Sequence, residues 1–450
     1  MKNTRKWVTL LLAIGMLMGL LAGCASDGNE TKSANTDNQQ AADAATAQTE
    51  TATEQSGTES SEKTIKIGVV YPLTGNTASS GNEAVGCLKV AAEIINGSYD
   101  IDFPGAKTEG IQSLGGAKIE IITADTQGSA EVAATETERL ITNENVVAIV
   151  GCDLSSGTKT ASAVAERHGV PFFNGESSSD TLIDRGLEYF FHVGPCDSTL
   201  IASTYDYLDL YRESLGIESV AICGSDDDGG SMFVEFCEKE AKERNYTIGT
   251  SIIYPTDAAT LSAECMKLKS CGADVLLIFA QNPASIIFLQ TMQEMDINFK
   301  SVITARGGFI STEFFDTVGD TAEYLMTENT WSLDSVSDKP WVAEMNQMCI
   351  DAVGCGMNGN YARAMQAFFT LVDALERAGS TDHDALRDAA KATDMGSESM
   401  ICSWEGVKFD ERGQNIYAAG IMTQVQGGTY VTIWPEIETA IFPVPTWSER

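Results

Sequence analysis

Residues 146–173 read VVAIVGCDLSSGTKTASAVAERHGVPFF, and this stretch decides the fold class. An apolar run at 146–150 predicts a buried strand. A loop then leads into a predicted helix at 158–168, which Gly169 closes, and residues 170–173 predict the next strand. Strands that alternate with helices at this spacing are typical of a parallel sheet with helices on both faces. The stretch therefore predicts an α/β fold.

The same alternation extends on both sides of this stretch and restarts near residue 219. Further strands are predicted at 65–71, 118–122, 219–223, 247–253, 274–279 and 301–304, and further helices at 84–95, 130–142, 232–244, 261–270, 284–295 and 361–377. A strand-rich tail follows at 406–410, 416–426 and 430–434. The region from 63 to 450 is too long for a single hydrophobic core. Two α/β lobes of similar construction are therefore expected.

The N-terminus has the three parts of a secretory signal. Basic residues at 2–6 precede an apolar stretch at 7–23, and Leu-Ala-Gly-Cys, ending at Cys24, resembles the lipobox of bacterial lipoproteins. We expect a signal peptide at 1–23 and acyl chains (palmitate) on Cys24. We also expect a disordered tether through residue 62, because residues 25–62 have no aromatic or large aliphatic side chain. The alternative is a transmembrane anchor. A membrane-spanning helix needs about 20 apolar residues, and the stretch at 7–23 is at the short limit of that length.

The net charge and the cysteines limit the kinds of partner and metal site that the protein can have. The chain has 64 acidic and 29 basic residues and a net charge of −35, which argues against nucleic acid and against electrostatic docking to anionic lipid. Export permits disulfides. Among the 11 cysteines, the pairs near enough in sequence to bond are Cys265 with Cys271 and Cys349 with Cys355. No Cys-x-x-Cys spacing occurs and there are only 3 histidines, so a metal site is not expected.

Ligands of open parallel sheets bind beyond the carboxyl ends of the strands, so functional residues are expected in the loops that follow them. None of these loops carries a catalytic or cofactor motif. Residues 224–231 have the glycine spacing of a phosphate loop, but Gly230 replaces the lysine and the acidic residues at 226–228 would repel phosphate. Those acidic residues fit a solvated, helix-capping loop, with calcium binding as the alternative. We therefore expect no enzyme and no cofactor.

Two hydroxyl-rich loops remain as candidates for ligand binding. Ser155 and Ser156 stand at a junction between a predicted strand and a predicted helix, where free N–H groups and the helix dipole favour a carboxylate. Simple N-capping by serine is the alternative. The sequence ESSSD at 176–180 follows the next predicted strand and again places hydroxyl side chains at a strand end. Both loops are consistent with a site for a small carboxylate.

Several segments together resemble a known family. They are IKIGVVYPLTG at 65–75, AIVGCDLSSG at 148–157 with GVPFF at 169–173, and FDERG at 409–413 with TQVQGGTYV at 423–431. In this order, over residues 64 to 445, they resemble the branched-chain amino-acid type of ABC-transporter substrate-binding protein, a type I periplasmic binding protein. No single motif is diagnostic, but their order and spacing are fairly specific.

The resemblance implies two Rossmann-like lobes joined by three crossings, near residues 196, 329 and 416, with ligand bound between them and a hinge motion on binding. The first lobe would comprise 63–196 and 330–416, and the second 197–329 and 417–450. A monomer outside the cytoplasm, held to the bacterial membrane by its lipid, would deliver a small ligand to an ABC permease. The alternative is a ligand-sensing receptor domain of the same fold that reports to a partner protein.

The resemblance also assigns roles to residues. Ser155, with Ser156 beside it, matches the serine that holds the ligand carboxylate. Glu176, Ser177 and Ser178 belong to the next contacting loop, and Asp197 matches an acidic residue against the ammonium.

Two positions of the second lobe depart from the family pattern. Gln281 replaces an aromatic residue, and Arg306 replaces an acidic one. An arginine that faces the ligand would favour a second carboxylate, so we expect a more polar or acidic ligand than a branched-chain amino acid. The alternative is that Arg306 turns outward or pairs with an aspartate.

Overall fold

A computed structural model describes residues 63–305, 307–435 and 439–450 of the chain. The predicted signal peptide, the lipidation site Cys24, the predicted tether and Arg306 lie outside the described residues.

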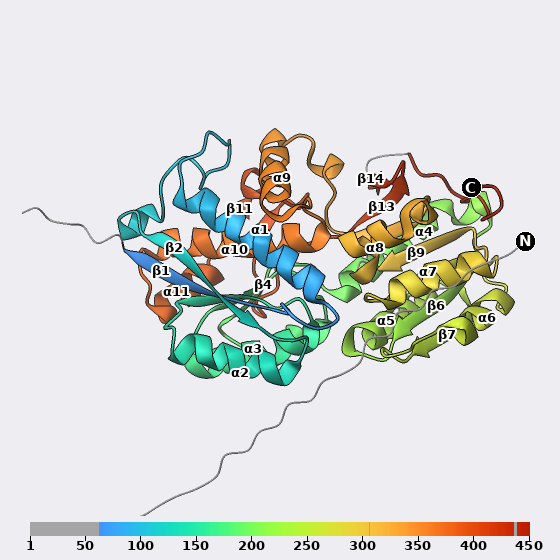
Figure 1. Ribbon diagram of the computed structural model, residues 1–450, viewed down its shortest axis with the longest axis horizontal. Coiled ribbons are helices and arrows are strands. Elements are labelled where there is room, and N and C mark those ends of the chain that lie inside the picture. Colours follow the sequence, from blue (N-terminus) through green and yellow to red (C-terminus); the bar gives the residue numbers. More distant parts are fainter. Residues whose placement is uncertain (1–62, 306, 436–438) are drawn as a thin grey trace, which may run out of the picture. The chain divides into compact units, whose positions relative to one another are not determined.

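The first sheet has five parallel strands in the order β2-β1-β3-β4-β5 (Figure 1). Its strands are β1 (Thr64–Tyr71), β2 (Lys118–Asp125), β3 (Ala148–Gly151), β4 (Phe172–Asn174) and β5 (Phe190–His192), and the helices around it are α1 (Ala78–Asn96), α2 (Ala130–Thr142), α3 (Ser155–His168), α9 (Pro340–Val353), α10 (Gly359–Ala378) and α11 (His383–Lys391). Helices α2 and α3 pack together on one face, and α1 and α10 on the other.

The second sheet has seven strands in the order β14-β13-β10-β9-β8-β6-β7. Strands β6 to β10 run parallel to one another, whereas β13 pairs antiparallel with β10 and β14 with β13. Its strands are β6 (Ser219–Ser225), β7 (Thr247–Tyr254), β8 (Val275–Ile278), β9 (Ser301–Ala305), β10 (Met326–Asn329), β13 (Ile421–Gln426) and β14 (Thr429–Trp434), and its helices are α4 (Asp197–Leu215), α5 (Asp228–Glu243), α6 (Ser262–Ser270), α7 (Ala284–Glu294) and α8 (Thr312–Val318). A short hairpin of β11 (Asp394–Gly396) and β12 (Gly406–Lys408) forms a third sheet.

Each large sheet is the centre of one lobe, and the predicted α/β class with two lobes is confirmed. The chain passes from the first sheet to the second between β5 and α4, returns between β10 and α9, and passes across again between β12 and β13. Helix α4 packs on α5, β10 and β13, so it belongs with the second sheet. Both sheets therefore depend on segments that are far apart in sequence.

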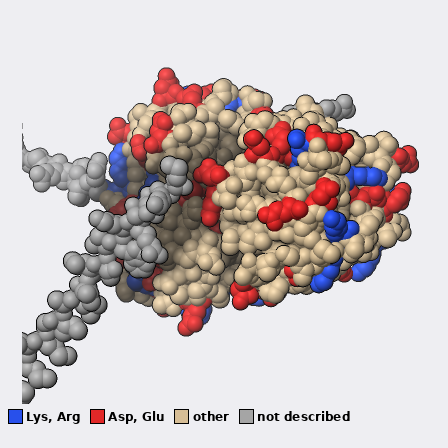
Figure 2. Space-filling model, turned by 45° about the vertical axis from the view of Figure 1, so that its right-hand side comes forward, with Lys and Arg blue, Asp and Glu red and all other residues tan. Residues whose placement is uncertain are grey.

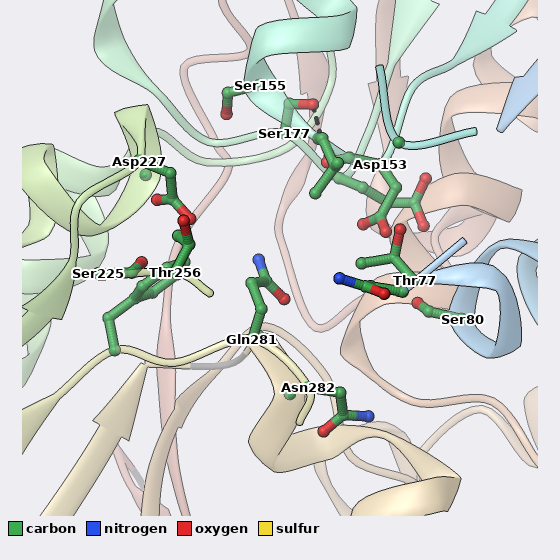
Figure 3. A pocket seen from close by; sticks show the side chains of 18 of the residues that line it. Thr77, Ser80, Asp153, Ser155, Ser177, Ser225, Asp227, Thr256, Gln281 and Asn282 are labelled. Carbon is green, nitrogen blue, oxygen red and sulfur yellow. Dashed lines mark hydrogen bonds between the residues drawn. The ribbon is translucent and has the colours of Figure 1, made fainter. Parts of the chain in front are cut away.

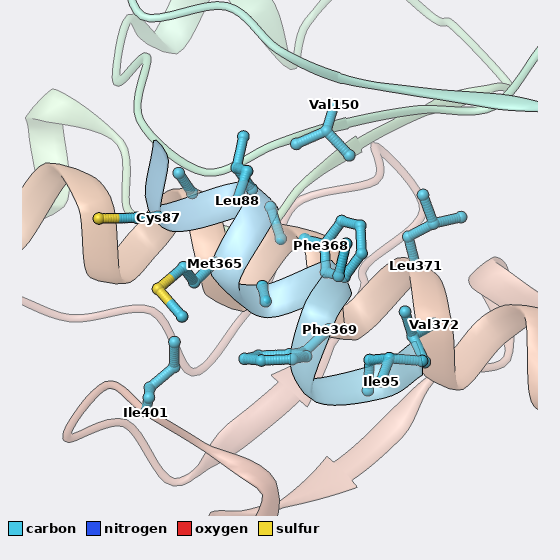
Figure 4. Close-up of a cluster of buried hydrophobic side chains, with 14 of the residues drawn as sticks. Cys87, Leu88, Ile95, Val150, Met365, Phe368, Phe369, Leu371, Val372 and Ile401 are labelled. Atoms are coloured by element: carbon cyan, nitrogen blue, oxygen red, sulfur yellow. The ribbon is translucent and has the colours of Figure 1, made fainter. Parts of the chain in front are cut away.

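Helix α10 forms the centre of the first lobe's core. Figure 4 shows Phe368, Phe369 and Leu371 of this helix packed beside Leu88 and Ile95 of α1. Each such buried side chain contributes about 1.5–3 kcal/mol of burial free energy. Because α10 also contacts β3 and β4, its position fixes the loops that follow those strands.

Helix α3 begins three residues earlier than predicted, at Ser155 and not at Thr158. The Thr158 side chain explains the difference, since its Oγ1 is a buried hydrogen-bond partner of the Cys152 backbone and of Ser177, not a helix cap. Helix α5 likewise starts at Asp228, because Asp227 caps it by accepting from the Gly230 N–H at 2.7 Å. The expected capping role of this acidic loop is thus confirmed.

The ten described cysteines are all free thiols.

Candidate ligand-binding site

A cavity of about 510 Å³ lies between the two lobes, within the size range of small-molecule sites. Its lining comes from the loops that follow β1, β3, β4, β6, β8 and β9 and from helices α4 and α10. Figure 3 shows Thr77, Ser80 and Asp153 on one side of the cavity and Ser225, Asp227 and Thr256 on the other, with Gln281 between them. The few apolar side chains in this lining are those of Leu154, Tyr254, Phe279 and Ala284. Most of the side chains in the lining are therefore polar.

Ser155 and Ser156 are the first two residues of α3 and line the cavity. The N-cap position is held by Leu154, which offers no side-chain cap, so the capping alternative is wrong for both serines. Across the described part of the chain, neither serine hydroxyl makes a hydrogen bond. The first N–H groups of a helix have no intrahelical partner. This corner of the cavity therefore presents free donors and a positive dipole end, which favour a carboxylate.

Ser177 and Ser178 lie in the loop after β4, and both line the cavity. The Ser177 hydroxyl lies 3.0 Å from the carbonyl oxygens of Cys152 and Asp153 and 2.6 Å from Thr158 Oγ1. Its side chain thus joins the loops after β3 and β4. Ser178 accepts a 2.7 Å hydrogen bond from the Asp197 N–H through its carbonyl oxygen, which links this loop to the start of α4.

Glu176 is a buried carboxyl group in the wall of the cavity, with 4% of its surface exposed. Its Oε2 accepts a short hydrogen bond from the Tyr71 hydroxyl of β1. Burial, and then the nearby negative charge of Asp153, raise the pKa of Glu176 well above its usual range. Burial also raises the pKa of Asp153 to about 6, and the positive charge of Arg363 opposes this shift. Two acids with raised pKa values thus share one end of the cavity.

Arg363 of α10 is a buried cation beside these acids, with 1% of its surface exposed. Its Nη1 donates to the carbonyl oxygens of Glu176 at 2.7 Å and Gly175 at 3.2 Å, and its Nη2 donates to Asn360 Oδ1 at 2.7 Å. The guanidinium therefore holds the loop after β4 in place, and its positive charge offsets part of the rise in the pKa values of Asp153 and Glu176.

Two predicted residues reach the cavity from the second lobe. Asp197 is the first residue of α4, is buried, and lies in the cavity lining. Gln281 follows β8 and is also in the lining. The structure thus brings together Ser155, Ser156, Glu176, Ser177, Ser178, Asp197 and Gln281 at one cavity, while Arg306 lies outside the described residues.

Sequence reasoning missed Asp153, Tyr71 and Arg363. Asp153 stands two residues before Ser155 in a loop already expected to bind ligand, so its position alone could have identified it. Tyr71 and Arg363 gave no such signal, because they meet Glu176 only through contacts that span 105 and 187 residues of sequence.

The described lining of the cavity is strongly acidic. Its carboxylates are those of Asp153, Glu176, Asp197, Asp227, Asp228 and Glu313, and Arg363 is the basic residue within the described lining. In Figure 2 the visible face is hollowed between the lobes, and acidic side chains stand at the edge of the hollow.

No group of acidic, histidine or cysteine side chains in the described residues has the arrangement of a metal site. Among those residues, no helix has the length and apolar character needed to span a bilayer.

Comparison with known proteins confirms the resemblance noted in the sequence. A family model described as periplasmic binding protein matches residues 64–429. "Leu/Ile/Val-binding protein homolog 7" of Brucella abortus (strain 2308) is 28% identical over 395 residues, covering 85% of this chain and 94% of the relative. Homolog 8 of the same strain is 26% identical over 384 residues, covering 83% of this chain and 91% of the relative.

Solved structures show the same fold. A leucine-binding protein, LivK, from Thermotoga maritima has a TM-score of 0.69 at 19% identity, covering 82% of this chain and 97% of that chain. The substrate-binding protein LivJ from Streptococcus pneumoniae, solved with isoleucine, has a TM-score of 0.68 at 20% identity, covering 82% of this chain and 100% of that chain. Since the family model spans most of the sequence, the chain belongs to the periplasmic binding protein family, whose members bind ligands outside the cytoplasm and are not enzymes.

Proposed function

We propose that this protein captures an amino acid or a similar small polar carboxylate between its lobes and delivers it to the permease of an ABC importer. The observation that carries this proposal is the pairing, in one cavity, of the uncapped start of α3 with the buried Asp197. An α-amino acid needs donors for its carboxylate and an anion for its ammonium, and these two features supply both.

The proposed roles follow from the positions of the side chains. Ser155, Ser156 and the first N–H groups of α3 bind the carboxylate, and Asp197 binds the α-ammonium. Ser177 keeps the two loops of the first lobe together, so it acts as a positioning residue. Gln281 approaches from the second lobe and closes over the ligand in a hinge motion. We take residues 63–196 with 330–416 as the first lobe and 197–329 with 417–450 as the second.

The relatives and solved neighbours are named for leucine, isoleucine and valine, but the cavity of this chain favours a more polar ligand. A branched aliphatic side chain gains about 1.5–3 kcal/mol when an apolar pocket buries it. The described lining offers four apolar side chains among many hydroxyl, amide and carboxylate groups. Burial of a leucine side chain there would leave polar groups without partners, which costs free energy.

A thermal-shift panel of amino acids tests the proposal. A ligand that binds the folded protein raises its stability by RT ln(1 + [L]/Kd), about 2.7 kcal/mol at a hundredfold excess over Kd. We expect polar amino acids to raise the midpoint of unfolding and leucine to raise it less. If no amino acid changes the midpoint while an unrelated solute such as a sugar does, the proposal is wrong.

The N-terminal lipid anchor is the second part of the proposal. Acyl chains on Cys24 and the following segment would keep the ligand-binding lobes near the permease, because two or more chains hold a protein stably at a membrane. We therefore expect Cys24→Ala to move the protein from the membrane fraction to the soluble fraction without a change in ligand affinity. Fractionation followed by calorimetry on both forms measures this. A variant that stays with the membrane would contradict the anchor.

A further inference from the structure

The described lining of the cavity holds more negative charge than a zwitterionic amino acid can neutralise. Six acidic residues and one arginine belong to this lining. An amino acid with an uncharged side chain brings one ammonium and one carboxylate, so its net charge is zero. The proposed function uses Asp197 for the ammonium and the start of α3 for the carboxylate. The acidic pair at the Asp153 end of the cavity is left without a counter-charge from such a ligand.

Glu176 has an unsatisfied oxygen at this end. One carboxylate oxygen accepts from the Tyr71 hydroxyl, but the other, Oε1, is buried and has no hydrogen-bond partner in the part of the chain that the structure describes. Buried polar atoms almost always have a partner, and an unpartnered carboxylate oxygen in a cavity wall is a candidate ligand contact. Ser225 Oγ, across the same cavity, is also buried without a hydrogen-bond partner among the described residues. Arg363 donates to the backbone carbonyl of Glu176, and the Tyr71 hydroxyl donates to its Oε2, so both the backbone and the side chain are held in the cavity wall.

Asp153 is the second member of the pair. Its half-buried side chain lines the cavity on the same side as Thr77 and Ser80 (Figure 3). Within the described residues, no hydrogen bond or ion pair engages its carboxylate. Asp153 and Glu176 follow the adjacent strands β3 and β4 and line the same cavity, and the negative charge of Asp153 contributes to the raised pKa of Glu176. Two nearby carboxylates in a partly buried site repel each other, and both pKa values stay raised although Arg363 opposes the shift, so a further cation would favour the ionised pair.

We propose that Asp153 and Glu176 form a subsite for a cationic side chain, and that the ligand is a basic amino acid whose ammonium or guanidinium lies between the two carboxylates. This inference rests on the proposed amino-acid-binding function. The cation supplies the missing donor to Glu176 Oε1 and removes the repulsion between the two acids. An anionic ligand would instead add a charge to an already negative cavity, and an aliphatic one would leave both acids unpaired.

The direction of the pH dependence follows from the groups around Glu176. They are the Tyr71 hydroxyl from β1, Asp153 from the loop after β3, and the Arg363 guanidinium from α10. Burial raises the pKa of Asp153 to about 6 and that of Glu176 well above its usual range. Below about pH 6 Asp153 is therefore mostly protonated in the free protein, and the raised pKa of Glu176 acts in the same direction, so a cation that binds there displaces protons. Affinity for a basic ligand should rise as the pH increases through this range, with release of protons on binding.

Isothermal titration calorimetry of the whole described domain, with L-lysine and L-arginine as probes, tests the proposal. L-norleucine is the matched control, because it has a similar length to lysine but lacks the side-chain ammonium. We expect at least one basic probe to bind about tenfold or more tightly than norleucine at about pH 8, with weaker binding below about pH 6. Titration in buffers of different ionisation enthalpy should show proton release.

Glu176→Gln and Asp153→Asn keep the size of each side chain and remove its charge. Each should weaken binding of the basic probe by about tenfold or more and reduce proton release, while norleucine binding stays the same. Asp316→Asn is the control, because Asp316 is exposed on α8 outside the cavity lining and its loss changes the net charge equally. Thermal unfolding checks that each variant is folded.

Two results would overturn the proposal in different ways. Binding of norleucine or L-glutamate as tight as that of the basic probes would reject the cationic subsite and leave amino-acid binding intact. Failure of the folded protein to bind any amino acid would reject the proposed function together with this inference.

Discussion

Gly175→Ala is expected to lower the free energy of unfolding by about 3 kcal/mol and to abolish ligand binding. Gly175 follows β4, where a Cβ atom would lie 2.2 Å from the carbonyl oxygen and 2.6 Å from the carbonyl carbon of Arg363. Gly194 also lies close to Gly175, since a Cβ on Gly194 would be 2.1 Å from the Gly175 carbonyl oxygen. The backbone segments around Gly175, Gly194 and Arg363 are therefore in close contact. Since α10 is buried along its length, it cannot move aside to admit a methyl group. The loop that carries Glu176 must shift instead.

Chemical denaturation and calorimetry measure the two effects of Gly175→Ala. Gly157→Ala is the matched control for stability, because Gly157 lies within α3 and its Cβ would have ordinary contacts of 3.6 Å or more. Alanine is favoured over glycine in a helix by about 1 kcal/mol, so this control should be as stable as the wild type or more so. An equally stable Gly175→Ala variant would show that the loop and α10 are not in close contact.

Arg363→Met is expected to reduce the free energy of unfolding by about 3–5 kcal/mol. Methionine has a similar length but no donors, so the carbonyl oxygens of Gly175 and Glu176 and the Asn360 amide oxygen would lose their partner inside the lobe. The variant also removes the positive charge that opposes protonation of Asp153 and Glu176, and their pKa values should rise further. We therefore expect weaker binding of any ammonium-bearing ligand as well.

Denaturant titration of Arg363→Met measures this loss against Arg167→Met. Arg167 lies at the exposed end of α3 and pairs with Glu138 at 3.3 Å, a surface contact worth about 0–1 kcal/mol. Arg363→Lys should recover only part of the stability, because one ammonium cannot reproduce the planar set of donors. Equal effects of Arg363→Met and Arg167→Met would mean that the buried guanidinium does not hold the loop.

Local patterns in the sequence predicted the fold well, because each strand and its loop carry their own signal. The apolar run at 146–150 and the helix that Gly169 closes correspond to β3 and α3, and the loops after β1, β3, β4, β6, β8 and β9 contribute to the cavity. Periodicity did not indicate where α3 begins, since Thr158 resembles a cap residue in sequence but is a buried partner of Ser177.

The electrostatic part of the site could not be predicted in the same way. Arg363 lies within an apolar helical pattern, and its partners in the loop after β4 are more than 180 residues away in sequence. The raised pKa of Glu176 depends on burial and on the proximity of Asp153, both of which arise only when β1, β3, β4 and α10 are assembled. The sequence therefore indicated a carboxylate site through Ser155, whereas the acidic pair became visible only in three dimensions.

Mass spectrometry of the small molecule released from the gently unfolded, purified protein tests whether the cavity holds a basic amino acid. We expect one equivalent of an amino acid with a basic side chain, and no released molecule from the Gly175→Ala variant, in which the cavity is disrupted. Release of a ligand that lacks either a carboxylate or an amino group would contradict the account.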